Sequence, residues 1–446
     1  MSILEAKQLD LICMEGNMDE LTVKEYLTQG AMLAEYGKYP EAITYYDKAE
    51  QENPMNFEIY LAKGIAYANM NQFDVAKAQF EKVLKINRTL GEVYFHLGNI
   101  AVLQEDSVLA FENYNKAIVN GYNEAQLFHC IGLLHAEKGE DELAINNYTK
   151  AIKLDPLRPD IRICKAELLI ESNRIPEALQ VLDDAILTNP NYFEGHHLKF
   201  VVLLRQHQLD KAEETLTNAL NLFPEDSQFM MDKVALLVDQ NKTDEALSLL
   251  NELEESPENN SKMRQISMAR AQIFSAKADI QAAIKELEKA NVLVNQEGEF
   301  DTEIVFLLAN CYMTAGKYDK LLKYSHQIIE KSDVLSYKQI AQYYIPMALK
   351  MLGRMEEAQP LYQEAIKEFR NQALVEPTNM DVYILRAMCL RDLEQFNEAL
   401  KLIDYVITLQ PNAIEPRTLR ITLLESLGRI AEGQEETVLV NTIFSK

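Results

Sequence analysis

His129, Cys130 and His135 come nearest to a metal-binding group in this 446-residue sequence. Imidazole and thiolate are both ordinary ligands for zinc. The six-residue step between the two histidines, however, points them to different sides of a helix, because each residue is rotated by about 100° from the last. The sequence therefore predicts no metal site at this position, and we expect no cofactor.

Other arrangements that would indicate catalysis are also missing from the sequence. The glycine-lysine pairs Gly37-Lys38 and Gly316-Lys317 lack the preceding glycine of a phosphate-binding loop and are each followed by a tyrosine, which is typical of turns. No HExxH or GxSxG motif and no cysteine pairing suited to zinc is present. We therefore expect a protein that is not an enzyme.

Charge and composition restrict the kinds of partner. The chain carries 44 basic and 69 acidic residues, a net charge of −25, which repels nucleic acid and anionic lipid surfaces. Its first 14 residues include Glu5, Lys7 and Asp10 instead of an apolar signal core, and no apolar run is long enough to span a membrane. Five scattered cysteines favour reduced thiols. We expect a cytoplasmic protein whose partners are neither nucleic acid nor membrane.

One small residue recurs at a fixed step and divides the chain into units. Alanine recurs every 34 residues, and we call these residues the anchors: Ala42, Ala76, Ala110, Ala144, Ala178, Ala212 and Ala246. In the first four units, a glycine precedes the anchor by twelve residues and an aromatic residue follows it by four, as in Gly64, Ala76 and Phe80. Spacings of three, four and seven lie on one face of a helix, so each unit is predicted to contain two helices.

Turn residues and insertions complete the unit. Prolines such as Pro54, Pro156 and Pro190 end units, and sequences such as Lys138-Gly139 separate the two helices. Further anchors lie at Ala283, Leu321, Ala358, Ala399 and Gly433, the first four at longer steps of 37, 38, 37 and 41 residues. The additional residues are polar or turn-rich, so we expect them in loops or in an extended second helix.

These features resemble the tetratricopeptide repeat family, whose first helix carries a large aromatic residue, a Leu-Gly pair and a tyrosine, and whose second helix carries small and aromatic residues before a closing proline. The resemblance is strongest from Tyr26 to Pro54 and is specific over residues 23–257. It implies an all-α fold, a right-handed superhelical solenoid of about twelve antiparallel helix pairs. The expected parts are an N-terminal capping helix (1–22), seven regular units (23–257), four units with longer connections (258–413), and an atypical C-terminal unit and cap (414–446).

The resemblance also implies that the first helices line a groove that holds a partner segment. The expected floor consists of Leu61, Phe95, Asn99, His129, Leu133, Ile163 and His197, with Met231 and Ala235 continuing its two rows. Phe95 stands where members that bind chaperone tails carry a lysine, so that ligand class is disfavoured. We expect Phe95 to contribute most to binding, because large aromatic residues dominate interface energies.

An acidic rim is expected three residues ahead of the floor, formed by Glu58, Glu92, Asp160 and Glu194. Two interpretations remain open: the carboxylates stabilise helix N-termini through the helix dipole, or they attract a basic ligand. Residues 1–250 carry a net charge of −18 and the remainder −7, which places most of the negative charge in the regular half.

The expected function is a non-enzymatic scaffold that binds a peptide or protein segment combining apolar anchors with lysine or arginine. A peptide-sensing regulator is an alternative, although such sensors carry an effector element before the repeats and only about 22 residues precede them here. An assembly factor or co-chaperone is another alternative, although envelope-tethered forms need a lipid anchor and the residues before Cys13 are charged. At the other end, the apolar run from Val438 to Val440 is expected either to fold back onto Leu423 and Leu424 or to mediate self-association.

Overall fold

The computed structural model describes residues 21–256, 262–296 and 298–444, and within these ranges the chain is helical, without a strand. A first helix covers residues 21–35. The expected capping helix over residues 1–22, including Cys13, lies outside the described residues except for positions 21 and 22. The described helices therefore begin with the first helix of the first repeat.

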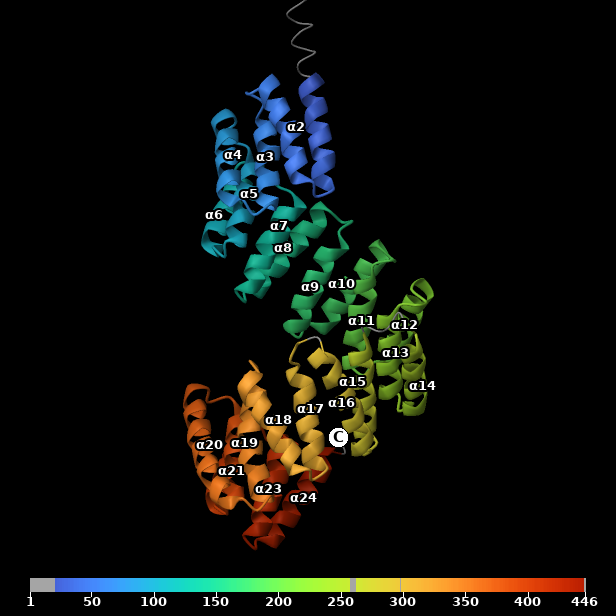
Figure 1. Ribbon diagram of the computed structural model, residues 1–446, viewed down its shortest axis with the longest axis vertical. Helices are drawn as coiled ribbons and strands as arrows, with labels where there is room; N and C mark the ends of the chain where they lie inside the picture. The colour runs from blue at the N-terminus through green and yellow to red at the C-terminus, as the bar shows by residue number, and fades with distance from the viewer. Residues whose placement is uncertain (1–20, 257–261, 297, 445–446) are drawn as a thin grey trace, which may run out of the picture. The chain divides into compact units, whose positions relative to one another are not determined.

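The chain divides into two compact units, Met1–Pro224 and Glu225–Lys446, which we call unit 1 and unit 2 (Figure 1). Beyond the first helix, the helices of unit 1 are α2 (Tyr39–Glu52), α3 (Phe57–Asn69), α4 (Phe73–Ile86), α5 (Gly91–Leu103), α6 (Ser107–Val119), α7 (Ala125–Glu137), α8 (Asp141–Leu154), α9 (Pro159–Glu171), α10 (Ile175–Thr188), α11 (Phe193–Arg205) and α12 (Leu209–Leu222). The helices of unit 2 are α13 (Ser227–Asp239), α14 (Thr243–Glu255), α15 (Met263–Ala276), α16 (Ile280–Gln296), α17 (Thr302–Thr314), α18 (Tyr318–Lys331), α19 (Leu335–Met351), α20 (Met355–Val375), α21 (Met380–Asp392), α22 (Phe396–Leu409), α23 (Ile414–Ser426) and α24 (Ile430–Phe444).

Consecutive helices pair, so the described residues form twelve helix pairs, six in each unit. This confirms the predicted all-α repeat solenoid. The predicted change from regular to longer units at residue 257 falls inside unit 2. There the second helices α16 and α20 have 17 and 21 residues, where most other helices have 13 or 14. Part of the inserted sequence therefore extends second helices, as expected.

The helices of a pair meet through a small residue and a ring. A Cβ atom added to Gly64 on α3 would lie 2.4 Å from Cε1 of Phe80 on α4, and one added to Gly98 would lie 2.4 Å from Cε1 of Tyr114. The anchor alanines of both units, from Ala42 to Ala399, are fully buried. The glycines thus let the aromatic side chain of the second helix lie directly on the backbone of the first.

Successive pairs are also joined by polar contacts that recur at one position of the repeat. A lysine or arginine thirteen residues before an anchor reaches a polar residue five residues after the preceding anchor, and we call it the bridging cation. The five examples are Lys63 to Asp47 (2.6 Å), Lys165 to Thr149 (2.9 Å), Lys199 to Asp183 (2.6 Å), Arg270 to Asn251 (2.7 Å) and Arg420 to Asp404 (2.7 Å). Each contact links a first helix to the second helix of the pair before it.

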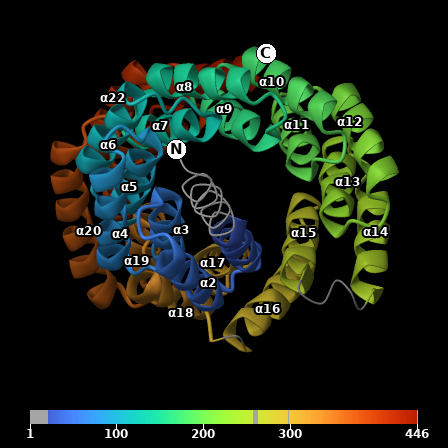
Figure 2. The same cartoon turned by 90° about the horizontal axis from the view of Figure 1, so that it is seen from above.

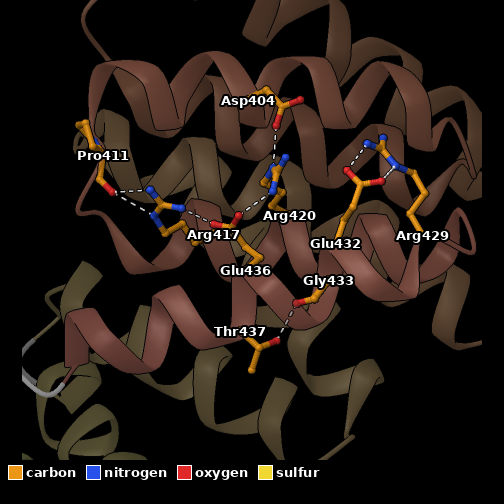
Figure 3. Close-up of polar contacts among 9 residues, drawn as sticks. All are labelled: Asp404, Pro411, Arg417, Arg420, Arg429, Glu432, Gly433, Glu436 and Thr437. Carbon is orange, nitrogen blue, oxygen red and sulfur yellow. Dashed lines mark hydrogen bonds and ion pairs between the residues drawn. The ribbon is translucent and has the colours of Figure 1, made fainter.

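The last helix, α24, is held by charge as well as by apolar packing. Glu436 on α24 pairs with both Arg417 and Arg420 on α23, and its side chain is only 5% exposed (Figure 3). Val440 is buried, whereas Val438 and Leu439 are 64% and 48% exposed. The expected folding back of the C-terminal apolar run therefore holds for Val440 but not for its two neighbours. The side chain of Phe444 lies outside the described residues.

Candidate functional site

The predicted floor residues all lie on the first helices of their pairs. In unit 1, α7, α9 and α11 follow the inner side of a curved row of helices, and α8, α10 and α12 follow the outer side (Figure 2). The floor and rim residues therefore share the inner helices, and their accessibility decides which of them a partner can reach.

Two predicted floor residues belong to the core of unit 1. Phe95 is 5% exposed, and its ring stacks on Tyr122 at a centroid distance of 5.1 Å and on Tyr114 at 6.1 Å. Ile163 is 8% exposed and packs in a cluster with Ala166. The tight contact between α5 and α6 draws Phe95 inward, so its large ring is covered by its own repeat and not available as the principal anchor.

His129 and Asn99 are partly buried and already engaged with the protein. The Tyr114 hydroxyl donates to Asn99 Oδ1 at 2.8 Å. His129 Nε2 lies 3.6 Å from Cys164 Sγ, while its buried Nδ1 has no hydrogen-bond partner. Burial lowers the pKa of His129, and Arg158 lowers it further against the opposing effect of Asp160. The imidazole is therefore neutral at pH 7 and offers a hydrogen bond instead of a charge.

The remaining floor residues are more accessible. Leu133 on α7 is 45% exposed, and Leu61 on α3 is half-buried. His197 on α11 is partly buried and stacks on Phe193, with ring centroids 5.9 Å apart. In unit 1, Leu133 is thus the predicted floor residue with the most apolar surface for a partner.

The predicted rim is less acidic than its sequence indicates. Arg158 forms a two-point ion pair with Asp160, with distances of 2.8 and 2.5 Å. Hydrogen bonding and charge from Arg158 hold the pKa of Asp160 below its usual value. Glu92 lies 3.9 Å from His96 Nε2, whereas Glu58 and Glu194 are exposed in the first turns of α3 and α11. The rim therefore consists of two open carboxylates and two that face cations or a histidine.

A cavity opens where the two floor rows continue into unit 2. It lies between α13 and α15 and has a volume of about 400 Å³. Met231 and Ala235 form one wall, and Met268 and Gln272, which occupy the same two repeat positions on α15, form the other. We call it the inner cavity. Its volume falls in the range of sites that hold a ligand or a side chain.

The chemistry of the inner cavity is that of an apolar receptor with a polar edge. Val234, Val238, Ala269 and Ile273 complete its apolar lining, and Asp239, Gln265 and Gln272 are exposed at its margin. Methionine side chains adapt their shape to different apolar partners. The arrangement can therefore receive an apolar side chain and place a carboxylate beside it.

Metal and disulfide chemistry find no support in the described part of the chain. No three His, Cys, Asp or Glu side chains converge there as a metal site, and His135 instead contacts Glu140 at 2.5 Å. Cys130, Cys164, Cys311 and Cys389 are free thiols. In residues 21–256, 262–296 and 298–444, none of the helices has the length and hydrophobicity needed to cross a bilayer.

Family comparisons match the regions in which the repeat is regular. Models described as tetratricopeptide repeat match residues 137–199, 203–273 and 57–90, and one described as TPR repeat matches residues 30–71. The chain is a tetratricopeptide repeat protein. Proteins of this family generally act as scaffolds that bind other proteins, which agrees with the helix pairs described above. A comparison with curated proteins gave no match.

Solved tetratricopeptide repeat structures resemble parts of the chain. YrrB, described as having an unusual peptide-binding site, is 21% identical over 42% of this chain and 97% of its own, with a TM-score of 0.35. A tetratricopeptide repeat protein from Parabacteroides merdae is 15% identical over 59% and 100%, with a TM-score of 0.48. Pseudomonas aeruginosa pilF is 16% identical over 48% and 98%, with a TM-score of 0.40.

Sequence reasoning missed the inner cavity and the bridging cations. Met231 and Ala235 were placed in the correct rows, but their partners on α15 follow an insertion that breaks the 34-residue step. The bridging cations had a visible signal, since Asp47 and Lys63, like Asp183 and Lys199, are sixteen residues apart. A search for charge pairs at that spacing would have found them.

Proposed function

We propose that this tetratricopeptide repeat protein is a non-enzymatic scaffold that binds a segment of another protein along its inner helices. The inner cavity carries this proposal, because it is an accessible apolar site on the rows where a partner is expected. An apolar side chain of the partner would enter between Met231 and Met268. Burying such an anchor in a well-formed pocket is the usual source of binding energy in protein interfaces.

The accessible floor of unit 1 would extend the contact. Leu133 offers apolar surface, while Glu58 and Glu194 offer carboxylates that are not paired with lysine or arginine in the described contacts. With Asp239 beside the inner cavity, these groups favour a segment in which lysine or arginine accompanies the apolar anchor. Such binding would weaken as ionic strength rises, because exposed charges are screened.

The first experiment is selection of a ligand on the full chain. Random dodecamer peptides would be displayed and selected, and the strongest binder would be mapped by hydrogen exchange. We expect slower exchange in α13 and α15 in the complex, since a bound segment restricts local opening. Protection confined to outer helices such as α14 and α16 would contradict the proposal. The peptide-sensing and assembly-factor alternatives use the same surface, so the selected sequence also narrows the choice between them.

A further inference from the structure

A second cavity lies among α18, α19 and α20 of unit 2 and has a volume of about 370 Å³. We call it the outer cavity, because α18 and α20 are second helices and Figure 2 shows α20 outside α19. Apolar walls and polar groups share its lining, which consists of Ile329, Ile345, Pro346, Leu361 and Ala365 together with His326, Gln342, Glu364 and Glu368. It is distinct from the inner cavity of the proposed function, which lies between first helices.

The repeat explains why space remains at this position. Ile345 lies thirteen residues before the anchor Ala358, where five other pairs have a bridging cation, and His326 lies five residues after the anchor Leu321, where they have its polar partner. At the corresponding place in unit 1, Lys199 reaches Asp183 at 2.6 Å across the gap between successive pairs. Between α18 and α20 the long cationic side chain is missing, and its volume is not filled.

Groups that accept hydrogen bonds remain around the unfilled space. Gln342 Oε1 is buried and has no hydrogen-bond partner. Glu364 makes no contact among those described, and Glu368 accepts only from Gln372 Nε2 at 3.2 Å. A buried acceptor without a donor is unfavourable, and two nearby carboxylates make a positively charged donor the best complement. The outer cavity thus presents acceptors at its polar side and methylene-compatible walls elsewhere.

We propose that the outer cavity binds a lysine or arginine side chain of a partner polypeptide. The alkyl stem would lie against Ile345, Pro346 and Leu361, and the ammonium or guanidinium group would donate to Glu364 and Gln342. Charge complementarity supports this occupant, as does the fact that the chain fills the equivalent gap with its own Lys63, Lys199 or Arg420 elsewhere. The partner would therefore supply from outside what the repeat supplies from within.

The test observes the cavity directly in the full chain. Isoleucine methyl NMR would follow Ile345 and Ile329 during titration with a blocked pentapeptide holding one arginine between glycines, and with the same peptide holding one lysine. Saturating shifts at both methyls are expected, and a citrulline peptide of equal shape should bind about tenfold more weakly because it lacks the charge. Equal binding of the citrulline peptide, or no shift at about 10 mM of either cationic peptide, would overturn the proposal.

Two variants test the assignment in different ways. Ile345→Lys combined with His326→Asp recreates the pair seen between Lys199 and Asp183, and should remove the peptide-induced shift at Ile329 while thermal stability is kept. Glu364→Gln leaves the cavity open and should weaken binding of the arginine peptide several-fold, whereas Glu356→Gln, outside the lining on α20, should not. Unchanged binding in Glu364→Gln would contradict the proposed contact even where the double variant fails to fold.

The source of the cation is tested separately. Butylamine and butylguanidine carry the same group without a peptide backbone. If they bind more tightly than the peptides, the outer cavity is a site for a free amine and the polypeptide assignment is wrong. Ala235→Leu, which fills the inner cavity, should leave these titrations unchanged, so the outcome is independent of the proposed function.

Discussion

Gly64 shows how little space separates the helices of a pair. Its hydrogen faces the ring of Phe80, and a methyl group there would lie 2.4 Å from the ring, well inside van der Waals contact. Gly64→Ala should therefore destabilise the chain by about 1 to 3 kcal/mol through overpacking. Gly433→Ala is the matched control, because a Cβ there meets its nearest atom at 3.7 Å and occupies the anchor position. It should stabilise α24 by about 0.5 to 1 kcal/mol, as expected for replacing a helical glycine.

Thermal and urea unfolding of the two glycine variants measure these effects. A neutral Gly64→Ala would mean that Phe80 can move aside at little cost. The sequence was sufficient to predict the small residue at this position, because the 34-residue step aligned it in four units. It was not sufficient for Phe95, since the repeat position indicates a first helix but not which neighbouring rings, here Tyr114 and Tyr122, cover the side chain.

At the scale of the element, α24 depends on one buried carboxylate. Glu436→Gln would leave Arg417 and Arg420 facing each other without a neutralising charge, in a site where Glu436 is 5% exposed (Figure 3). Breaking a buried ion pair from one side costs about 3 kcal/mol or more. We therefore expect amide hydrogen exchange in α24 to become faster in this variant.

Glu432→Gln provides the comparison on the same helix. Glu432 pairs with Arg429 at the surface, where both side chains are more than 40% exposed, so its loss should cost less than about 1 kcal/mol. Similar exchange in the two variants would show that α24 is held by apolar packing alone. The sequence indicated the apolar part of this contact, through Val440. The charged part was not predicted, because it depends on how α22, α23 and α24 are placed together.

At the scale of the whole molecule, stability should be local. In a repeat protein each pair contacts mainly its neighbours, so a change in one pair spreads over a short distance. Gly64→Ala should accelerate amide exchange in α3, α4 and the adjacent pairs of unit 1, and leave α21 to α24 of unit 2 unchanged. Uniform acceleration along the chain, measured by mass spectrometry, would show instead that both units unfold as one.

The number and type of elements were predictable because periodicity is a local property of the sequence. The two cavities were not, since each arises where the period is interrupted: one follows the insertion after Ser256, and the other lies where Ile345 replaces a cation. The departures from the repeat, and not its regular part, thus provide the accessible sites of this molecule.

The central claim is that a partner segment anchors in the inner cavity. Its most direct test is the affinity of the selected peptide for Ala235→Leu, in which the added side chain fills the space between α13 and α15. Ala31→Leu is the control, since Ala31 is an exposed residue at the same repeat position outside the cavity. We predict that affinity falls at least about tenfold in Ala235→Leu and is unchanged in Ala31→Leu, with both variants as stable as the parent chain. Equal affinity for the parent chain and Ala235→Leu would contradict the account.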